Sequence, residues 1–252
     1  MNRFKAASLH VLISLTIVTL VICAMYFLWF LRAYFSLMGG KELIALIGVV
    51  DVFVGPILTF ILFKPGKKGL KFDLFCIGLL QVAALTYGVY VMLQARPIFN
   101  VFNKNEFQIG AVVDITPEEL AKAKNPQWRK TSNTGPQLVA IGVPDKENKY
   151  ETIFAFNVSG YAYRYPRLYD DYNKHREEVI KAGKPLAELA KDSAENKSVI
   201  EKFLTKISRP ESDFLAVPIS SELAEVSAIV DAKTGDFIQI IDAKPKAEAR
   251  KK

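Results

Sequence analysis

The residues best suited to chemistry in this chain lie inside an apolar stretch of its first half. Asp51, Gly55 and Thr59 are four residues apart and share one helix face with Gly48, and Pro56 lies just beside that face. A carboxylate in hydrocarbon is costly, and such residues usually face protein or water and mark function. Glycine lets another helix approach closely. This face therefore predicts either a polar clasp among helices of the chain or a docking surface for a partner helix.

Proteolysis inside the membrane is the first catalytic alternative, because Asp51 and Asp73 are both acids near apolar segments. Asp73 lies at the cytoplasmic end of the third segment, whereas Asp51 lies about 18 Å from that face at 1.5 Å per residue. Two catalytic carboxylates must be close enough to share a proton. The two histidines, His10 and His175, belong to no H-E-x-x-H, and there is no C-x-x-C or G-x-S-x-G. We therefore predict no enzyme activity, no cofactor and no metal site.

Three apolar segments must position the acidic face. Residues 6–31 and 74–93 carry no charged side chain, and residues 43–63 carry only Asp51. Each segment approaches or exceeds the roughly 20 residues that a helix needs to cross hydrocarbon. A cleaved signal peptide is the alternative for the first segment, but its apolar core is too long and no small-x-small site follows. We predict three transmembrane helices within a membrane domain over residues 1–95, which excludes a purely soluble protein.

The basic residues predict how the segments are oriented. Four lysines lie in residues 64–73, and Arg3 and Lys5 precede the first segment, whereas only Arg32 and Lys41 lie between the first two. Basic loops stay on the cytoplasmic side, so the N-terminus is cytoplasmic and the chain beyond residue 95 is exported. In a bacterium this makes a multi-pass inner-membrane protein with a periplasmic C-terminal domain.

Charge elsewhere in the chain argues against a nucleic-acid partner. The formal net charge of +7 divides into +5 for residues 1–95, with eight basic and three acidic residues, and +2 for the rest. A nucleic-acid-binding protein would concentrate basic residues on its soluble part. We therefore predict no nucleic-acid binding.

Two hydroxyl side chains are the expected partners of Asp51. At 1.5 Å per residue, Asp51, Tyr87 and Thr19 all lie about 10 to 12 Å below the outer face. Gln81 is about a turn and a half deeper than Tyr87 by the same spacing. The depth arithmetic thus predicts a hydrogen bond from Tyr87 or Thr19 to Asp51.

The second half reads as a mixed α+β domain over residues 96–243, followed by a disordered charged tail over residues 244–252. It contains no cysteine, since Cys23 and Cys76 both lie in the apolar segments, so its fold needs no disulfide. Alternation, turn residues and capping signals predict its elements. These are a strand or strand pair over 101–115, a helix beginning at Thr116, a strand over 137–143, helices over 147–158 and 185–207, a strand over 214–219, and a hairpin of 225–231 with 236–242.

A spaced motif gives the chain a specific resemblance. It comprises D-x-x-x-G-P-x-x-T from Asp51, D-L at Asp73, Q-x-x-A-L-x-Y-G from Gln81 and R-P-x-x-x-x-F from Arg96. Together these elements resemble the TfpX/TfpZ family of type IV pilin accessory proteins. Weaker likeness continues through the aromatic segment that contains Pro166 and Tyr169, the Pro-Leu-x-x-Leu helix start at 185–189, and residues 214–218 and 231–235.

The resemblance implies a pilin-specific chaperone of the inner membrane that helps a type IV major pilin enter the pilus. Pilin and membrane lipid are then the expected partners, and the oligomeric state stays open. The implied site comprises a membrane face of Asp51, Gly55, Pro56, Thr59, Gln81, Tyr87 and Gly88, a membrane-exit motif of Arg96 and Pro97, and the exported pair Pro166 and Tyr169.

Two other function classes remain open at this point. A membrane-anchored periplasmic sensor or ligand-binding protein would need a cytoplasmic output module, for which the inside segments of about five and ten residues leave no room under the predicted topology. A transporter is supported by Asp51 alone.

Overall fold

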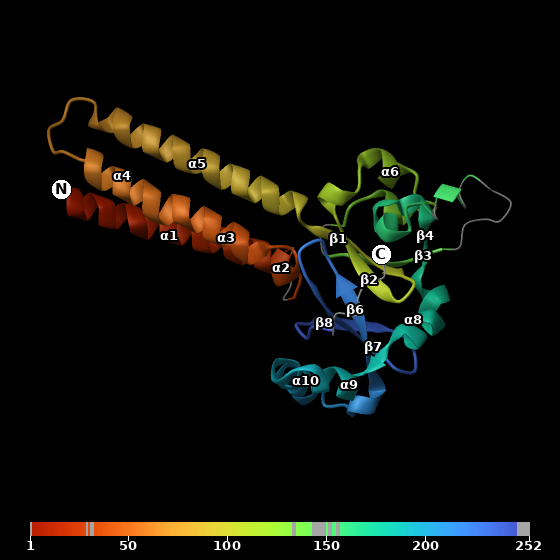
Figure 1. Cartoon of the computed structure of the whole chain (residues 1–252). Helices are drawn as coiled ribbons and strands as arrows, with labels where there is room; N and C mark the ends of the chain where they lie inside the picture. The colour runs from red at the N-terminus through yellow and green to blue at the C-terminus, as the bar shows by residue number, and fades with distance from the viewer. Residues whose placement is uncertain are drawn as a thin grey trace.

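The computed structural model describes residues 2–28, 30, 33–132, 135–142, 150, 153–154 and 157–245. Figure 1 shows two parts: a long arm of helices that begins at the N-terminus, and a sheet domain at the opposite end of the arm. The expected helix over 147–158 and the charged tail fall mostly outside the described residues.

Two helices of the arm are long and apolar enough to cross a membrane, by length and composition. They are α1, Arg3–Leu28, and α5, Leu70–Gln94, with 26 and 25 residues. At 1.5 Å per residue each is about 38 Å long. The first and third expected segments are therefore confirmed as helices of spanning length, shifted by a few residues at their ends.

The second expected segment is not one long α-helix, so the described residues contain two helices of spanning length where the sequence predicted three. It consists of α3, Gly40–Gly48, the π-helix η1, Val49–Val54, and α4, Gly55–Leu62. Pro56 has no amide hydrogen, so the carbonyl four residues earlier loses its α-helical donor. The amide of Gly55 instead donates to the carbonyl of Val50, five residues back, as in a π-helix.

A short helix, α2, Ala33–Leu37, joins the arm to the sheet domain. Leu37 is buried in the main core, and the Ser221 hydroxyl donates to its carbonyl at 2.6 Å. The Asn100 amide donates to the Tyr34 hydroxyl at 2.5 Å, and burial raises the pKa of Tyr34 to about 12. The sequence analysis predicted no element between the first two apolar segments, whereas the structure shows a short helix there that anchors the arm to the sheet domain.

The described residues of the sheet domain form an eight-stranded mixed sheet, with the order β4-β3-β1-β2-β6-β7-β8 and β5 paired to β6. The β1–β3 and β2–β6 pairs are parallel, and the other pairs are antiparallel. The strands are β1, Pro97–Asn103; β2, Glu106–Ala111; β3, Gln137–Ile141; β4, Tyr169–Asp171; β5, Lys184–Pro185; β6, Phe214–Ser220; β7, Glu225–Asp231; and β8, Phe237–Ile241.

Short helices surround this sheet. The α-helices are α6, Pro117–Ala121; α8, Arg176–Ala182; α9, Leu186–Asp192; and α10, Ala194–Ile207. The 3-10 helices are η2, Val112–Asp114; η3, Pro126–Arg129; η4, Ser159–Arg164; η5, Pro166–Leu168; η6, Tyr172–His175; and η7, Glu211–Asp213.

Several local predictions for this domain are confirmed. The strand pair predicted over 101–115 is β1 with β2, the predicted hairpin is β7 with β8, and Thr116 caps α6 by accepting from the Glu119 amide. The predicted single helix over 185–207 is wrong, because Ser193 is extended and splits it into α9 and α10. The Ser193 hydroxyl accepts from the Asn196 amide at 3.0 Å, so this residue acts as the N-cap of α10.

Candidate functional site

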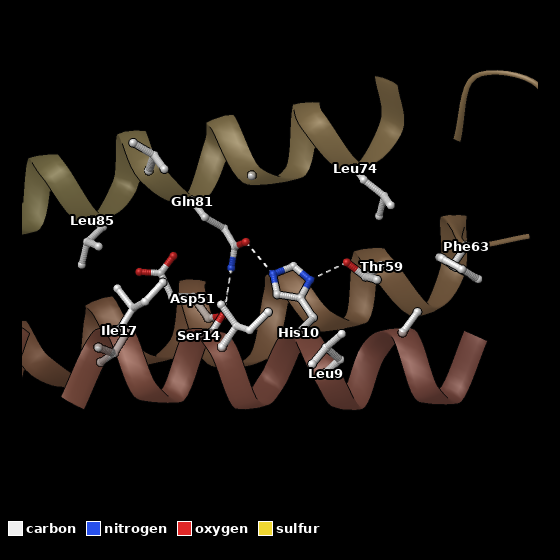
Figure 2. A pocket seen from close by; sticks show the side chains of 15 residues that line it. Leu9, His10, Ser14, Ile17, Asp51, Thr59, Phe63, Leu74, Gln81 and Leu85 are labelled. Atoms are coloured by element: carbon white, nitrogen blue, oxygen red, sulfur yellow. Dashed lines mark hydrogen bonds between the residues drawn. The ribbon is translucent and has the colours of Figure 1, made fainter. Parts of the chain in front are cut away.

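A histidine side chain contacts two neighbouring helices of the arm. His10 lies on α1, and its Nδ1 is 2.6 Å from the Thr59 hydroxyl on α4. Its Nε2 is 2.6 Å from the Gln81 amide oxygen on α5. Figure 2 shows the imidazole standing between the two partners. One side chain of α1 therefore holds both neighbouring helices.

Gln81 decides which nitrogen of His10 carries the proton. Its amide nitrogen donates to the Asp51 carbonyl at 3.0 Å and to the Ser14 hydroxyl at 3.3 Å. The amide oxygen is thus the atom that faces His10, and an oxygen of this kind only accepts. The network therefore assigns a proton to Nε2 of His10.

Sequence reasoning missed this role of His10, although a signal was present. His10 lies in a stretch without charged residues, and an unpaired polar group in hydrocarbon costs several kcal/mol. A polar partner on another helix was therefore required. The identity of that partner could not be read from a local pattern.

Asp51 is buried but is not the centre of the clasp. Its side chain is 4% exposed, and within the described residues neither carboxylate oxygen has a hydrogen-bond partner. The predicted bond from Tyr87 or Thr19 is wrong, because Tyr87 is 65% exposed and Thr19 is also on the outside of the arm. Gln81 binds the backbone carbonyl of Asp51 rather than its carboxylate.

The two motif glycines permit close contact between helices of the same chain. A Cβ atom on Gly55 would lie 2.2 Å from the Gln81 amide nitrogen, and one on Gly88 would lie 2.7 Å from the Ile47 side chain. Pro56 and Thr59 are buried alongside Gly55. The face around Gly55 is thus already covered by α5.

A groove of about 410 Å³ runs along the arm beside this network. Its walls are α1 and α5, and α4 with η1 lies between them (Figure 2). Among its wall residues, Leu9, Ile13 and Val82 are 49%, 50% and 62% exposed, so the groove is open along one side. The lining residues are Ala6, Leu9, His10, Ile13, Ser14, Ile17, Val18, Asp51, Thr59, Phe63, Leu74, Gly78, Gln81, Val82 and Leu85.

This groove has the composition of a binding site for an apolar partner. Its volume is in the range of about 300–1,000 Å³ that is usual for ligand pockets, which combine apolar walls with a few polar groups. Here the polar groups are His10, Gln81, Thr59, Ser14 and Asp51. Nowhere in the described part of the chain do three or more His, Cys, Asp or Glu residues gather so as to hold a metal ion.

The other predicted site residues lie apart from the groove. Arg96 and Pro97 are buried where α5 passes into β1, and the Val112 amide donates to the Arg96 carbonyl at 3.1 Å. Pro166 is buried, and Tyr169 packs edge-on against Phe99 with ring centroids 5.0 Å apart. These residues therefore support the join and the core of the sheet domain.

The buried phenol of Tyr169 is satisfied inside that core. Its hydroxyl donates to the Tyr163 carbonyl, and burial raises the pKa of Tyr169 well above its ordinary value. This side chain is held neutral as a packing element.

Known proteins resemble the chain along most of its length. It is 30% identical over 239 residues to a fimbrial assembly protein of serogroup I from Dichelobacter nodosus, covering 90% of both chains. It is 32% identical over 236 residues to the serogroup E1 protein of the same organism, again covering 90% of both. A third relative, named for serogroups C1 and C2, is 37% identical over 121 residues, which are 47% of this chain and 92% of that one.

No family model matches the chain, and no solved structure matches it. The relatives nevertheless extend through both the arm and the sheet domain, because the first two alignments cover nine-tenths of the sequence. The chain belongs to the family of fimbrial assembly proteins.

Proposed function

We propose that this protein is an inner-membrane accessory protein, a pilin-specific chaperone, that assists assembly of a type IV pilin into pili. It acts by binding rather than by catalysis. The names of the relatives support a role in fimbrial assembly, and the motif that resembles the TfpX/TfpZ family supports the assignment to type IV pilin.

The proposed topology has three crossings, with the N-terminus in the cytoplasm and the sheet domain in the periplasm. The consecutive pieces over Gly40–Leu62 are about 34 Å long at 1.5 Å per residue, which exceeds the hydrocarbon thickness of about 30 Å. The lysine-rich turn between α4 and α5 lies at the same end of the arm as the N-terminus (Figure 1). Both basic ends then lie in the cytoplasm.

The open groove between α1 and α5 is the observation that carries the proposal. An apolar helix of pilin can lie along this open groove and place its side chains between the apolar walls, and Asp51 and Thr59 of the motif help to line it. The sheet domain offers a second contact to the globular part of pilin. Two weak contacts on one chain raise affinity through effective concentration.

Filling the groove tests this function directly. Gly78 lines the groove, and a Cβ atom there would have no neighbour within 4 Å. Gly78→Leu should therefore accumulate normally in the membrane while pilin no longer copurifies with it and surface pili are lost.

Gly48→Leu is the matched control, because Gly48 is equally open but does not line the groove. This variant should keep both pilin binding and piliation. Normal pilin recovery with Gly78→Leu at normal protein levels would contradict binding in the groove.

A further inference from the structure

Several large apolar side chains of the sheet domain are exposed to solvent, and three of them lie on segments near one another. Val113, Tyr161 and Leu223 are 67%, 62% and 71% exposed. They come from η2, from η4 and from the turn between β6 and β7. Exposed apolar groups that cluster beside one another indicate an interaction surface rather than chance.

Two of these side chains lie at the base of the arm. The Val112 amide donates to the Arg96 carbonyl at 3.1 Å, so η2 packs on the end of α5 and carries Val113 there. Leu223 touches the turn that leads from α2 into α3, because its Cδ1 is 2.8 Å from the place of a Cβ on Gly39. The surface thus continues directly from the helices of the arm.

One arginine holds the three segments together. The Arg164 guanidinium pairs with Asp114 at 3.6 Å and with Glu222. These two acids are the sequence neighbours of Val113 and Leu223. The same guanidinium lies 5.4 Å from the centre of the Tyr161 ring. The three exposed side chains therefore lie on segments that Arg164 links to one another.

The length of the arm sets the depth of this patch. At 1.5 Å per residue, α1 and α5 are each about 38 Å long. Hydrocarbon is about 30 Å thick, and the bilayer with its headgroup layers is about 40–45 Å thick. With the basic end of the arm in one headgroup layer, the base of the arm emerges in the opposite headgroup layer.

We infer that Val113, Tyr161 and Leu223 form a membrane-seating surface that rests in the headgroup layer of the bilayer around the arm. This inference rests on the membrane crossing of the proposed function. Aromatic side chains favour that layer because the ring is apolar and the hydroxyl stays hydrated. The surface fixes the tilt of the sheet domain over the bilayer.

Spin labels on the full-length chain in vesicles of phosphatidylethanolamine and phosphatidylglycerol test the inference. In a Cys23→Ser, Cys76→Ser background, a single label is placed by Leu223→Cys or by Val113→Cys. Collision with oxygen reports lipid contact, and collision with a water-soluble nickel chelate reports exposure to water.

Two control labels give the collision rates expected in lipid and in water. Leu80→Cys lies midway along α5 on an exposed position, and Lys181→Cys lies on α8, on the side of the sheet domain away from the arm (Figure 1). We expect the labels at 113 and 223 to collide with nickel several-fold less often than the label at 181.

The outcomes separate the seating surface from the proposed function. Labels at 113 and 223 that are as open to nickel as the label at 181, with the label at 80 in lipid, would overturn the seating surface and leave the crossing intact. A label at 80 that is open to water would overturn the crossing and the surface together.

Discussion

Gly55→Ala should loosen the arm, because the only room for a new methyl group is taken by a hydrogen-bonding side chain. The added Cβ would lie 2.2 Å from the amide nitrogen of Gln81 and 2.6 Å from its Cδ. The Gln81 side chain can swing aside, but it then leaves its contacts with the Asp51 carbonyl, the Ser14 hydroxyl and His10.

The size of this destabilisation follows from the number of hydrogen bonds that are lost. Hydrogen bonds between membrane helices average about 0.6 kcal/mol, so the three contacts of Gln81 are worth ~2 kcal/mol together. The general gain of about 1 kcal/mol from replacing a helical glycine with alanine opposes this loss. Gly48→Ala receives the same gain without a clash, since a Cβ there has no neighbour within 4 Å. We therefore expect Gly55→Ala to be less stable than Gly48→Ala by about 2 kcal/mol.

Unfolding in mixed micelles, followed by circular dichroism as the fraction of denaturing detergent rises, measures this difference. A second pair of variants isolates the mechanism: in a Gln81→Ala background, the difference between the Gly55 and Gly48 substitutions should vanish. Equal stability of the two single variants would refute the claim that the space at Gly55 is needed by Gln81. A difference that persists without Gln81 would refute its assignment to these bonds.

Three further predictions concern single side chains. Asp51→Asn should not lower the free energy of unfolding, because no hydrogen bond to the carboxylate exists within the described residues and an unpaired buried carboxylate is itself costly; detergent unfolding measures this, and a large loss would contradict it. Tyr34→Phe should cost about 1–3 kcal/mol by leaving the buried Asn100 amide unpaired. The pKa of Tyr34, raised to about 12, also predicts a pH dependence. The contribution of Tyr34 to the free energy of unfolding should be complete below about pH 10 and lost towards pH 12. Tyr34→Phe should lack this loss when unfolding is measured against pH. Hydrogen bonds from Arg209 and backbone amides lower the pKa of Asp231 to about 2, so the contribution of Asp231 to the free energy of unfolding is complete above about pH 4 and lost towards pH 2. Arg209→Gln should raise the pKa of Asp231, which a carboxyl-resolved NMR titration measures. An unchanged pKa would contradict the pairing.

Local signals in the sequence predicted much of the fold. The absence of charge predicted α1 and α5, and alternation with a turn predicted the β7–β8 hairpin. The Thr116 cap was readable because capping depends on residues that are adjacent in sequence. The small size of Gly55 leaves space that the Gln81 side chain of α5 fills, in keeping with the role of small residues between membrane helices.

Contacts between distant segments could not be predicted in the same way. His10 meets partners 49 and 71 residues away, so no short window of sequence contains the clasp. The parallel β2–β6 pair joins Phe107 to Ile219, so it too could not be read from a short window of sequence. The docking of α2 through Leu37 depends on a core that exists only after the sheet has formed.

Crosslinking in the cell tests the central claim, that pilin binds in the groove of the arm, most directly. A photoreactive amino acid at Val82 stands in the groove, whereas one at Leu80, about 200° away on the same helix at 100° per residue, faces outward with similar exposure. The account predicts a pilin adduct from position 82 and none from position 80. Adducts of equal yield from both positions, or from position 80 alone, would contradict it.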